Sequence, residues 1–253
     1  MDMSSNFLAQ WLDERLCVSD FKDDSWNGLQ VANSGRVGRI CVGVDATLPF
    51  FEAAVTQGAG MVICHHGISW GPSLARITGL NYRLVSFLIK HDMALYGCHL
   101  PLDAHPELGN NGVLARVLGL EGRSPFACYN GQKIGICGEL AAAVEFEDFA
   151  DRVRRLVNID AVAHNLGSAK VKRVGVVSGG AAMTVAAAIA EGLDTYITGE
   201  PSLAGYNLAL QEGINVIYAG HYATEVFGVK AVLQLLKEEH GVEGEFVDQA
   251  VPY

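Results

Sequence analysis

The sequence predicts an α/β protein with mostly parallel β-strands. Short apolar runs alternate with helical patterns from Arg39 to Gln249, and this alternation is typical of parallel sheets flanked by helices. With 253 residues, 50% of them hydrophobic, the chain is long enough to bury a sizeable core. These two observations exclude a disordered or fibrous protein.

Each expected element follows from its local pattern. The first segment, residues 5–16, has helical spacing, and Ser4 or Ser5 is available as its N-cap. Continuous apolar runs predict buried strands, and apolar residues at helical spacing predict the helices between them. The expected strands are 40–44, 61–64, 93–98, 133–137, 173–177, 195–198, 215–219 and 244–248. The expected helices are 48–56, 82–91, 112–118, 146–156, 181–191, 203–211 and 225–239.

A division of the chain is expected near residue 125. Two glycines, a proline and several polar residues interrupt the alternating pattern between Glu121 and Gln132. We therefore expect a first half over residues 1–125 and a second over 126–225, with 226–253 rejoining the first because chain ends of compact proteins often meet.

Composition excludes several classes of protein. Eighteen Lys and Arg against 28 Asp and Glu give a net charge of −10 without a basic cluster, which argues against binding of extended nucleic acid. Apolar runs are too short for a membrane span, and the acidic N-terminus does not resemble a secretory signal. The six cysteines lack CxxC pairs and disulfide spacing, so we expect reduced thiols in a cytoplasmic protein.

Polar side chains follow three of the expected strands. The run Met61-Val-Ile-Cys ends in His65 and His66, and Ala94-Leu-Tyr-Gly-Cys is followed by His99 and Asp103. The third run, Ile214-Asn-Val-Ile-Tyr-Ala-Gly, ends in His221-Tyr-Ala-Thr-Glu225. Ligands collect outside the carboxyl ends of strands in open α/β sheets, so these ends predict a functional site.

The residue types at these ends favour a metal centre. His221 and Glu225 are four apart at an expected helix start, so both project from one face. Two adjacent histidines at a strand end can serve two ions separately, and carboxylates can bridge ions roughly 3.5 to 4 Å apart. Imidazoles mixed with carboxylates suit Zn, Fe, Mn or Co, and the lack of a ligating CxxC disfavours a structural zinc site. By contrast His91, His164 and His240 have contexts typical of structural histidines, while His105 precedes Pro106 and has the context of a loop residue.

These residues, in their order, resemble the Nif-three-like family, also labelled GTP cyclohydrolase I type 2 homologues. The resemblance covers essentially the whole chain, including Asp45 after a strand and a Ser178-Gly-Gly turn. It implies two interlaced αβ halves, two divalent metal ions per chain, and a ring-shaped homohexamer. By position, the implied metal ligands are His65, His66, Asp103, His221 and Glu225. Family members often carry a histidine several residues after the Gly-Glu element, but the segment that follows it here, Pro201-Ser-Leu-Ala-Gly-Tyr206-Asn207, contains none. The motifs that carry the resemblance are Cys64-His-His-Gly, Gly97-Cys-His-Leu-Pro-Leu-Asp103, Thr198-Gly-Glu200 and Ala219-Gly-His221-Tyr-Ala-Thr-Glu225.

Three further motifs admit alternatives. Ser178-Gly-Gly180 after a strand is either a tight turn or an anion-binding helix start, and it lacks the P-loop lysine. Glu200 is a general base, an orienter of a histidine, or a solvated loop residue. Gly67-Ile-Ser69-Trp-Gly71 matches the nucleophile-elbow pattern, although two histidines separate it from the strand that an elbow requires.

The expected function is a dinuclear metal-dependent hydrolase of a small nucleotide-like or phosphorylated molecule. Two ions would bind substrate oxygens and activate a water, with Glu200 and His99 as catalytic proton carriers. The alternative is a non-catalytic metal-binding protein that stores or senses ions, because the ligand set alone does not separate the two classes. Mean hydropathy of +0.22 is compatible with a homo-oligomer that hides apolar surface.

Overall fold

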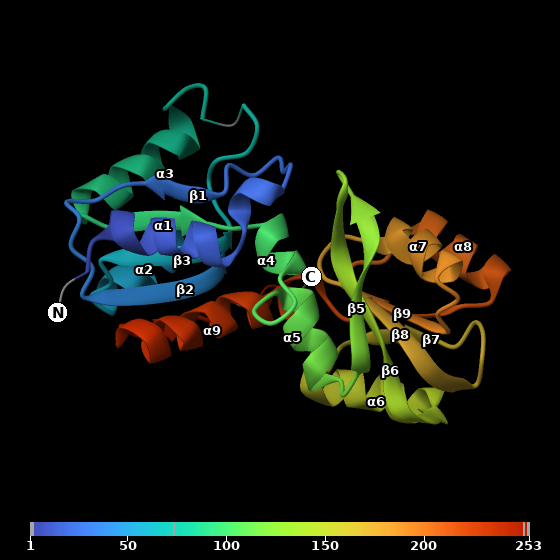
Figure 1. The fold of residues 1–253 in the computed structure, drawn as a ribbon. Helices are drawn as coiled ribbons and strands as arrows, with labels where there is room; N and C mark the ends of the chain where they lie inside the picture. Colours follow the sequence, from blue (N-terminus) through green and yellow to red (C-terminus); the bar gives the residue numbers. More distant parts are fainter. Residues whose placement is uncertain (1–2, 73, 250, 252–253) are drawn as a thin grey trace. The chain divides into compact units, whose positions relative to one another are not determined.

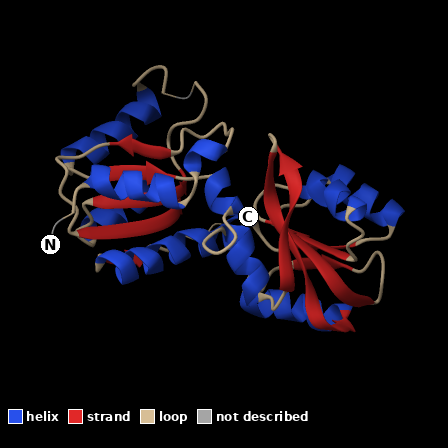
Figure 2. Cartoon of the chain, in the orientation of Figure 1, coloured by secondary structure: helices blue, strands red, loops and turns tan. Residues whose placement is uncertain are grey.

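The computed structural model describes residues 3–72, 74–249 and 251, and it divides the chain into two compact α/β units (Figure 1). Unit 1 ends at Leu102 and resumes over Gly228–Gln249, whereas unit 2 is Asp103–Phe227. Each unit contains one β-sheet with helices on both faces (Figure 2). Residues 103–227, which form unit 2, are therefore inserted in the chain between the two segments of unit 1.

The sheet of unit 1 has the strand order β1-β4-β3-β2-β11. Its strands are β1 (Gly28–Val31), β2 (Arg39–Asp45), β3 (Met61–His66), β4 (Ala94–Gly97) and β11 (Glu243–Phe246). The last four run parallel, and β1 pairs antiparallel with β4 at the edge. In register, Asp45 lies opposite His66 and Gly97 opposite Cys64, so β2, β3 and β4 end together.

Helices cover this sheet because its strands are apolar on both faces. Phe50, Phe51, Leu84 and Leu88 of α2 (Leu48–Thr56) and α3 (Gly79–Lys90) share a core with alternate strand residues such as Val62. The other helices are α1 (Ser5–Arg15) and α9 (His221–His240), which begins in unit 2 and ends in unit 1. They meet where the His240 ring packs edge-on against Phe7 and Trp11. The short helix η1 (Val18–Asp20) follows α1, and α4 (Leu100–Ala104) follows β4.

The sheet of unit 2 has a parallel centre with antiparallel flanks, in the order β5-β6-β8-β9-β10-β7. Its strands are β5 (Glu121–Tyr129), β6 (Gln132–Glu145), β7 (Val162–His164), β8 (Lys170–Val177), β9 (Thr195–Thr198) and β10 (Asn215–Tyr218). Only β8, β9 and β10 pair in parallel. The expectation of mostly parallel strands therefore describes unit 1 better than unit 2, where β5 and β6 form a long hairpin.

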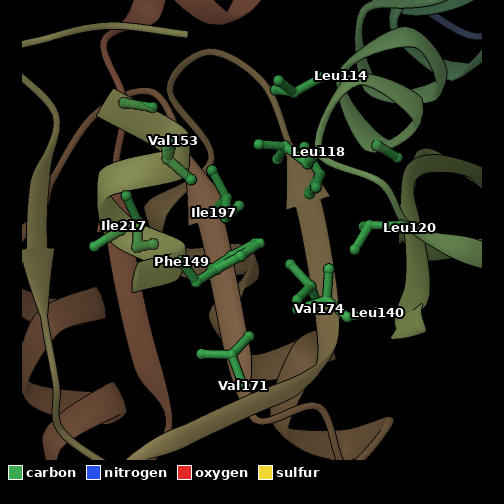
Figure 3. Packing of buried hydrophobic residues seen from close by; sticks show 14 of the residues in the cluster. Leu114, Leu118, Leu120, Leu140, Phe149, Val153, Val171, Val174, Ile197 and Ile217 are labelled. Carbon is green, nitrogen blue, oxygen red and sulfur yellow. The ribbon is translucent and has the colours of Figure 1, made fainter. Parts of the chain in front are cut away.

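Helices α5 (Asn110–Val117) and α6 (Phe146–Leu156) pack on one face of this sheet. On α6 the apolar residues Phe146, Phe149, Ala150 and Val153 follow helical spacing, so they form one buried stripe. They join strand residues such as Val174, Ile197 and Ile217 in one core, which is called the α6 core below (Figure 3). The other face carries η2 (Ala182–Thr184), α7 (Val185–Ala190) and α8 (Leu203–Glu212).

We expect Phe149→Ala to destabilise the protein by about 3–5 kcal/mol, the usual effect of truncating a buried aromatic ring. Phe149 is fully buried in the core that α6 forms with the sheet, so truncating its ring leaves a cavity there. Leu156→Ala on the same helix is the control, because Leu156 is 42% exposed. Denaturant unfolding monitored by circular dichroism measures both values. Equal effects of the two substitutions would contradict the assignment of this core.

Residue 125, near which a division of the chain was expected, lies inside β5. The glycines and the proline that interrupt the sequence pattern are accommodated by an edge strand, where a missing amide is tolerated, and by a register shift between Glu121 and Ser124. All six cysteines are free thiols. Within the described residues, no helix combines the length and apolar character needed to cross a bilayer.

Candidate metal centre

Three histidines gather at the carboxyl ends of β3 and β4 in unit 1. His65 and His66 are the last residues of β3, and His99 lies just beyond β4. Their ring centroids are 4.6 Å apart for His65 and His66, and 5.2 and 5.7 Å for the pairs with His99. One ring nitrogen of each lies within 4.8 Å of those of the other two, so this cluster has the residue types and spacing of a metal site.

Each of these rings is held through Nδ1. The Nδ1 of His65 lies 3.0 Å from the carbonyl oxygen of Cys98, and that of His66 lies 2.8 Å from Oδ1 of Asp45. Because both oxygens only accept hydrogen bonds, each Nδ1 donates its proton. In the neutral ring, Nε2 then carries the lone pair, which is the arrangement found in metal-ligating histidines.

His99 has the same arrangement with Asp23 as its partner. Its Nδ1 lies 2.9 Å from Asp23 Oδ1, and its backbone amide donates to Oδ1 of Asn27 at 2.8 Å. Burial alone would raise the pKa of Asp23, but hydrogen bonding and charge from His99, with help from Asn27 and the amide of Ser25, lower it to about 2. Asp23 is therefore an anion under all ordinary conditions, and it fixes the His99 ring.

The loop after His66 excludes a nucleophile elbow. Ser69 lies in irregular structure, and the next helix, α3, begins only at Gly79, so there is no strand-to-helix turn at the serine. The loop is instead held by Gln30, whose Oε1 accepts the amides of Ile68 and Ser69 at 2.8 and 3.1 Å. Trp70 packs edge-on against His99 with centroids 4.9 Å apart.

In unit 2 a histidine and two carboxylates meet at the start of α9. His221 Nδ1 lies 2.6 Å from Oε1 of Glu200, and His221 Nε2 lies 3.1 Å from Oε1 of Glu225. The four-residue spacing predicted that His221 and Glu225 share a helix face, and this contact confirms it. Of the roles considered for Glu200, orienting a histidine is the one that its contact supports.

The two carboxylates change the protonation of His221. Its hydrogen bond to Glu225 is the largest influence, and with Glu200 it outweighs burial and raises the pKa of His221 to about 9. At neutral pH the metal-free ring therefore carries a proton on Nε2. A metal ion would have to displace that proton, so metal binding through Nε2 would strengthen as the pH rises towards 9.

Asp103 is the second buried carboxylate of unit 2. Its Oδ1 accepts hydrogen bonds from Ser178 Oγ and Asn110 Nδ2, both at 2.9 Å. One of its oxygens lies within 4.8 Å of a carboxylate oxygen of Glu225. Glu225 thus lies near Asp103 through one carboxylate oxygen and contacts His221, so unit 2 offers carboxylate and imidazole donors around Glu225.

The Ser178-Gly179-Gly180 segment is a tight turn. The amides of Ser178, Gly179 and Ala181 donate to Asn111, Thr224 and Thr198, so they are already used within the fold. Gly179 has φ +66°, and a Cβ there would overlap Glu225 Oε1 and lie 3.1 Å from His221 Nε2. The missing side chain at residue 179 leaves the space that these two groups occupy.

Gly179→Ala should therefore destabilise the protein by at least about 1–2 kcal/mol, the strain of a left-handed backbone with a Cβ, and displace Glu225. Gly180→Ala is a matched control, because a Cβ there meets its nearest atom, Glu200 Oε2, at 3.4 Å. We expect that variant to change the free energy of unfolding by no more than about 0.5 kcal/mol. Denaturant titration of both variants tests this, and equal stabilities would contradict it.

The remaining histidines have structural contacts. The His91 ring lies tilted against the Phe87 ring with centroids 4.4 Å apart, and His240 packs against two aromatic rings of α1. His105 Nδ1 accepts the amides of Glu107 and Leu108 in a loop. His164 packs against Tyr206 and Tyr218.

Comparison with known proteins identifies the family of the chain. Residues 3–252 match the model of the Duf34/NIF3 (NGG1p interacting factor 3) family. The chain belongs to the Duf34/NIF3 family. A member from Deinococcus radiodurans, named GTP cyclohydrolase 1 type 2 homolog, is 43% identical over 241 residues, which are 95% of this chain and 91% of that protein. The resemblance inferred from the sequence motifs is thus confirmed at the level of the family.

Solved structures of similar proteins share the fold. The protein ybgI, described as of unknown function, superposes with a TM-score of 0.93 at 33% identity, covering 99% of this chain and all of that one. The Thermus thermophilus protein TTHA1606 has a TM-score of 0.91 at 36% identity, with 99% and 100% coverage. These two structures therefore share the fold of this chain over 99% of its length.

The predicted site residues fall into two groups in this family member. His65, His66 and His99 meet in unit 1, whereas in unit 2 Asp103 and His221 each lie near Glu225, and Glu200 contacts His221. Sequence reasoning missed the groups that hold these side chains in place. They are Asp23 and Asn27 around His99, and Asn110 and Asn111 around Asp103 and Ser178. The adjacent pair Asn110-Asn111 at a helix start was the one available signal.

Proposed function

We propose that this Duf34/NIF3 protein is a metal-dependent hydrolase of a small nucleotide-like or phosphorylated molecule. The proposed metal ligands are His65 and His66 in unit 1 and Asp103, His221 and Glu225 in unit 2. Two divalent ions per chain, drawn from Zn, Fe, Mn and Co, suit this mixture of imidazole and carboxylate donors. The family name that relatives carry, GTP cyclohydrolase 1 type 2 homolog, supports a nucleotide-like substrate.

One observation carries the proposal. The Nδ1 atoms of His65, His66, His99 and His221 each lie between 2.6 and 3.0 Å from an oxygen acceptor. Metal-ligating histidines almost always have such a partner, because it fixes the ring and directs the Nε2 lone pair to the ion. A structural histidine does not need this orientation. Four histidines that share it, each near the end of a strand, therefore favour a metal centre.

The proposed reaction is hydrolysis by a metal-activated water. When bound, divalent ions supply Lewis acidity and make water nucleophilic near neutral pH. Glu200 is a candidate proton carrier, because its side chain is 48% exposed and already hydrogen-bonds to His221. His99 is the other candidate, since the Asp23 carboxylate would stabilise the imidazolium that forms when Nε2 accepts a proton.

Elemental analysis followed by an activity screen tests the proposal. Protein purified without added metal should contain close to stoichiometric metal, and chelation should abolish the hydrolysis of a nucleotide or phosphoester until that metal is restored. Retained metal with no turnover of any such compound would contradict the hydrolase. Absence of turnover together with ready exchange of the ions would instead identify a protein that stores or senses metal.

We also propose a homo-oligomer, and the family resemblance implies a hexamer. Large apolar side chains are exposed in both units, among them Trp26 at 65%, Ile159 at 76% and Leu203 at 79%. Exposed apolar groups of this kind favour association. Light scattering at micromolar concentration tests this, and a monomer would contradict it.

A further inference from the structure

A recess of about 330 Å³ opens in unit 2 beside Glu200. It lies where β9 and β10 end, next to the glycines that precede Glu200 and His221. Carboxyl ends of parallel strands are the usual ligand-binding edge of an α/β sheet. The residues that matter for what it binds are Asp160, Val162, His164, Glu200, Pro201 and Tyr218.

Strand register places the recess on the face away from the α6 core. β7 and β10 run antiparallel with Val162 opposite Tyr218, and alternate residues along a strand face opposite ways. Ala163 and Ile217 contribute to the α6 core, so Val162, His164 and Tyr218 lie on the other face. The recess is therefore a surface feature separate from the packed interior in Figure 3.

The recess has an aromatic wall. The His164 ring packs edge-on against Tyr218 at 5.9 Å and against Tyr206 of α8 at 5.0 Å, so each ring holds its neighbour in place. Val162 and Pro201 add apolar surface. Rigid aromatic rings beside apolar side chains favour a flat aromatic ligand, which can stack or pack edge-on.

Its polar groups are mainly hydrogen-bond acceptors. The carboxylates of Asp160 and Glu200 accept hydrogen bonds and repel anions. The side chain of Asn158 is already used, because it donates to the carbonyl of Ala219 and accepts the amide of Asp160. A complementary ligand must carry N–H donors and must not place a phosphate here.

We infer that the recess binds an amino-substituted aromatic nitrogen heterocycle, the ring portion of the substrate. The ring would lie against Tyr218 and His164, with its N–H donors directed to Asp160. The volume is at the small end of ligand pockets and suits a ring system without its sugar and phosphates. Identifying this ligand as part of the substrate rests on the proposed function. Glu200 connects the two sites, because it lines the recess and also hydrogen-bonds to His221.

Equilibrium binding of guanosine to the metal-free protein tests the inference. Guanosine presents a ring N–H and an amino group on one edge, whereas inosine lacks the amino group and ribose 5-phosphate lacks the ring. We expect guanosine to bind more tightly than inosine, and ribose 5-phosphate not to bind. Asp160→Asn should weaken guanosine about tenfold, because a hydrogen bond to a charged acceptor is lost. Val162→Trp should fill the recess and remove binding.

Asp148→Asn, an exposed carboxylate on α6 away from the recess, is the control and should leave guanosine affinity unchanged. Absence of guanosine binding to the parent protein, or equal affinity in Val162→Trp, would overturn the inference. Guanosine binding without any metal-dependent turnover would contradict the proposed hydrolase but not the ring site. Turnover whose KM is unaffected by Val162→Trp would overturn the ring site and leave the hydrolase standing.

Discussion

Replacing His65 and His66 together by alanine is expected to abolish hydrolysis and to lower metal affinity more than about 100-fold. Loss of a group that only hydrogen-bonds to a metal ligand typically lowers metal affinity about 10–100-fold, and loss of two ligands should have a larger effect. Both side chains lie at the end of β3, whose pairing with β2 and β4 depends on backbone hydrogen bonds and on apolar residues further back. The far-ultraviolet circular dichroism of the double variant should therefore resemble that of the parent. Metal per chain and hydrolysis rate are the measurements.

His91→Ala is the matched control, because His91 packs against Phe87 at the end of α3, away from the strand ends. It should retain both metal and activity. Asp45→Asn offers a graded comparison, since it keeps His66 but weakens the group that holds its Nδ1. Unchanged hydrolysis by the double variant in metal-free buffer would eliminate metal catalysis by these residues.

Glu225→Gln is expected to lower the occupancy of both metal positions, whereas His65→Ala should leave about one of the two ions in place. This prediction follows if Glu225, a carboxylate of the proposed ligand set, bridges the two proposed ions, because glutamine keeps its size and one oxygen while removing the charge that offsets two dications. Metal stoichiometry per chain measures the difference. Full occupancy of both positions in Glu225→Gln would eliminate the bridging role.

The same substitution has a second expected effect in the metal-free protein. Glu225 is the main reason that the pKa of His221 is raised from 6.5 to about 9, so Glu225→Gln should lower that pKa. A raised histidine pKa stabilises the fold below about pH 6.5, and this contribution disappears as the pH rises through about 9. The variant should lose that pH dependence, which NMR titration of His221 and unfolding at several pH values would reveal.

Helices and central strands were predictable where the pattern was long and regular. Residues 48–56, 146–156 and 195–198 were expected as elements with the bounds that α2, α6 and β9 have. The strands β1 and β7 were missed because four and three residues carry too little periodicity, and β5 because glycines and a proline occupy its exposed half. A strand at the edge of a sheet needs less apolar surface, so its sequence resembles a loop.

The site was predictable to the extent that its chemistry lies at strand ends. The four-residue spacing of His221 and Glu225 placed them on one helix face, as their 3.1 Å contact confirms. Asp23 was not predictable, because it lies in an irregular acidic segment and reaches His99 only through a contact 76 residues apart in sequence. Side chains that support a site from distant loops leave no periodic trace, so only a structure reveals them.

The contact between Gln30, Gly67 and Gly97 has an evolutionary consequence. The Gln30 side-chain amide occupies the volume that a Cβ at either glycine would need. Its Oε1 also accepts hydrogen bonds from the backbone amides of Ile68 and Ser69, which shape the loop after His66. A side chain at residue 67 or 97 requires a smaller residue at 30, which would release that loop. Among homologous sequences these three positions should therefore covary, with substitutions appearing together as compensated sets.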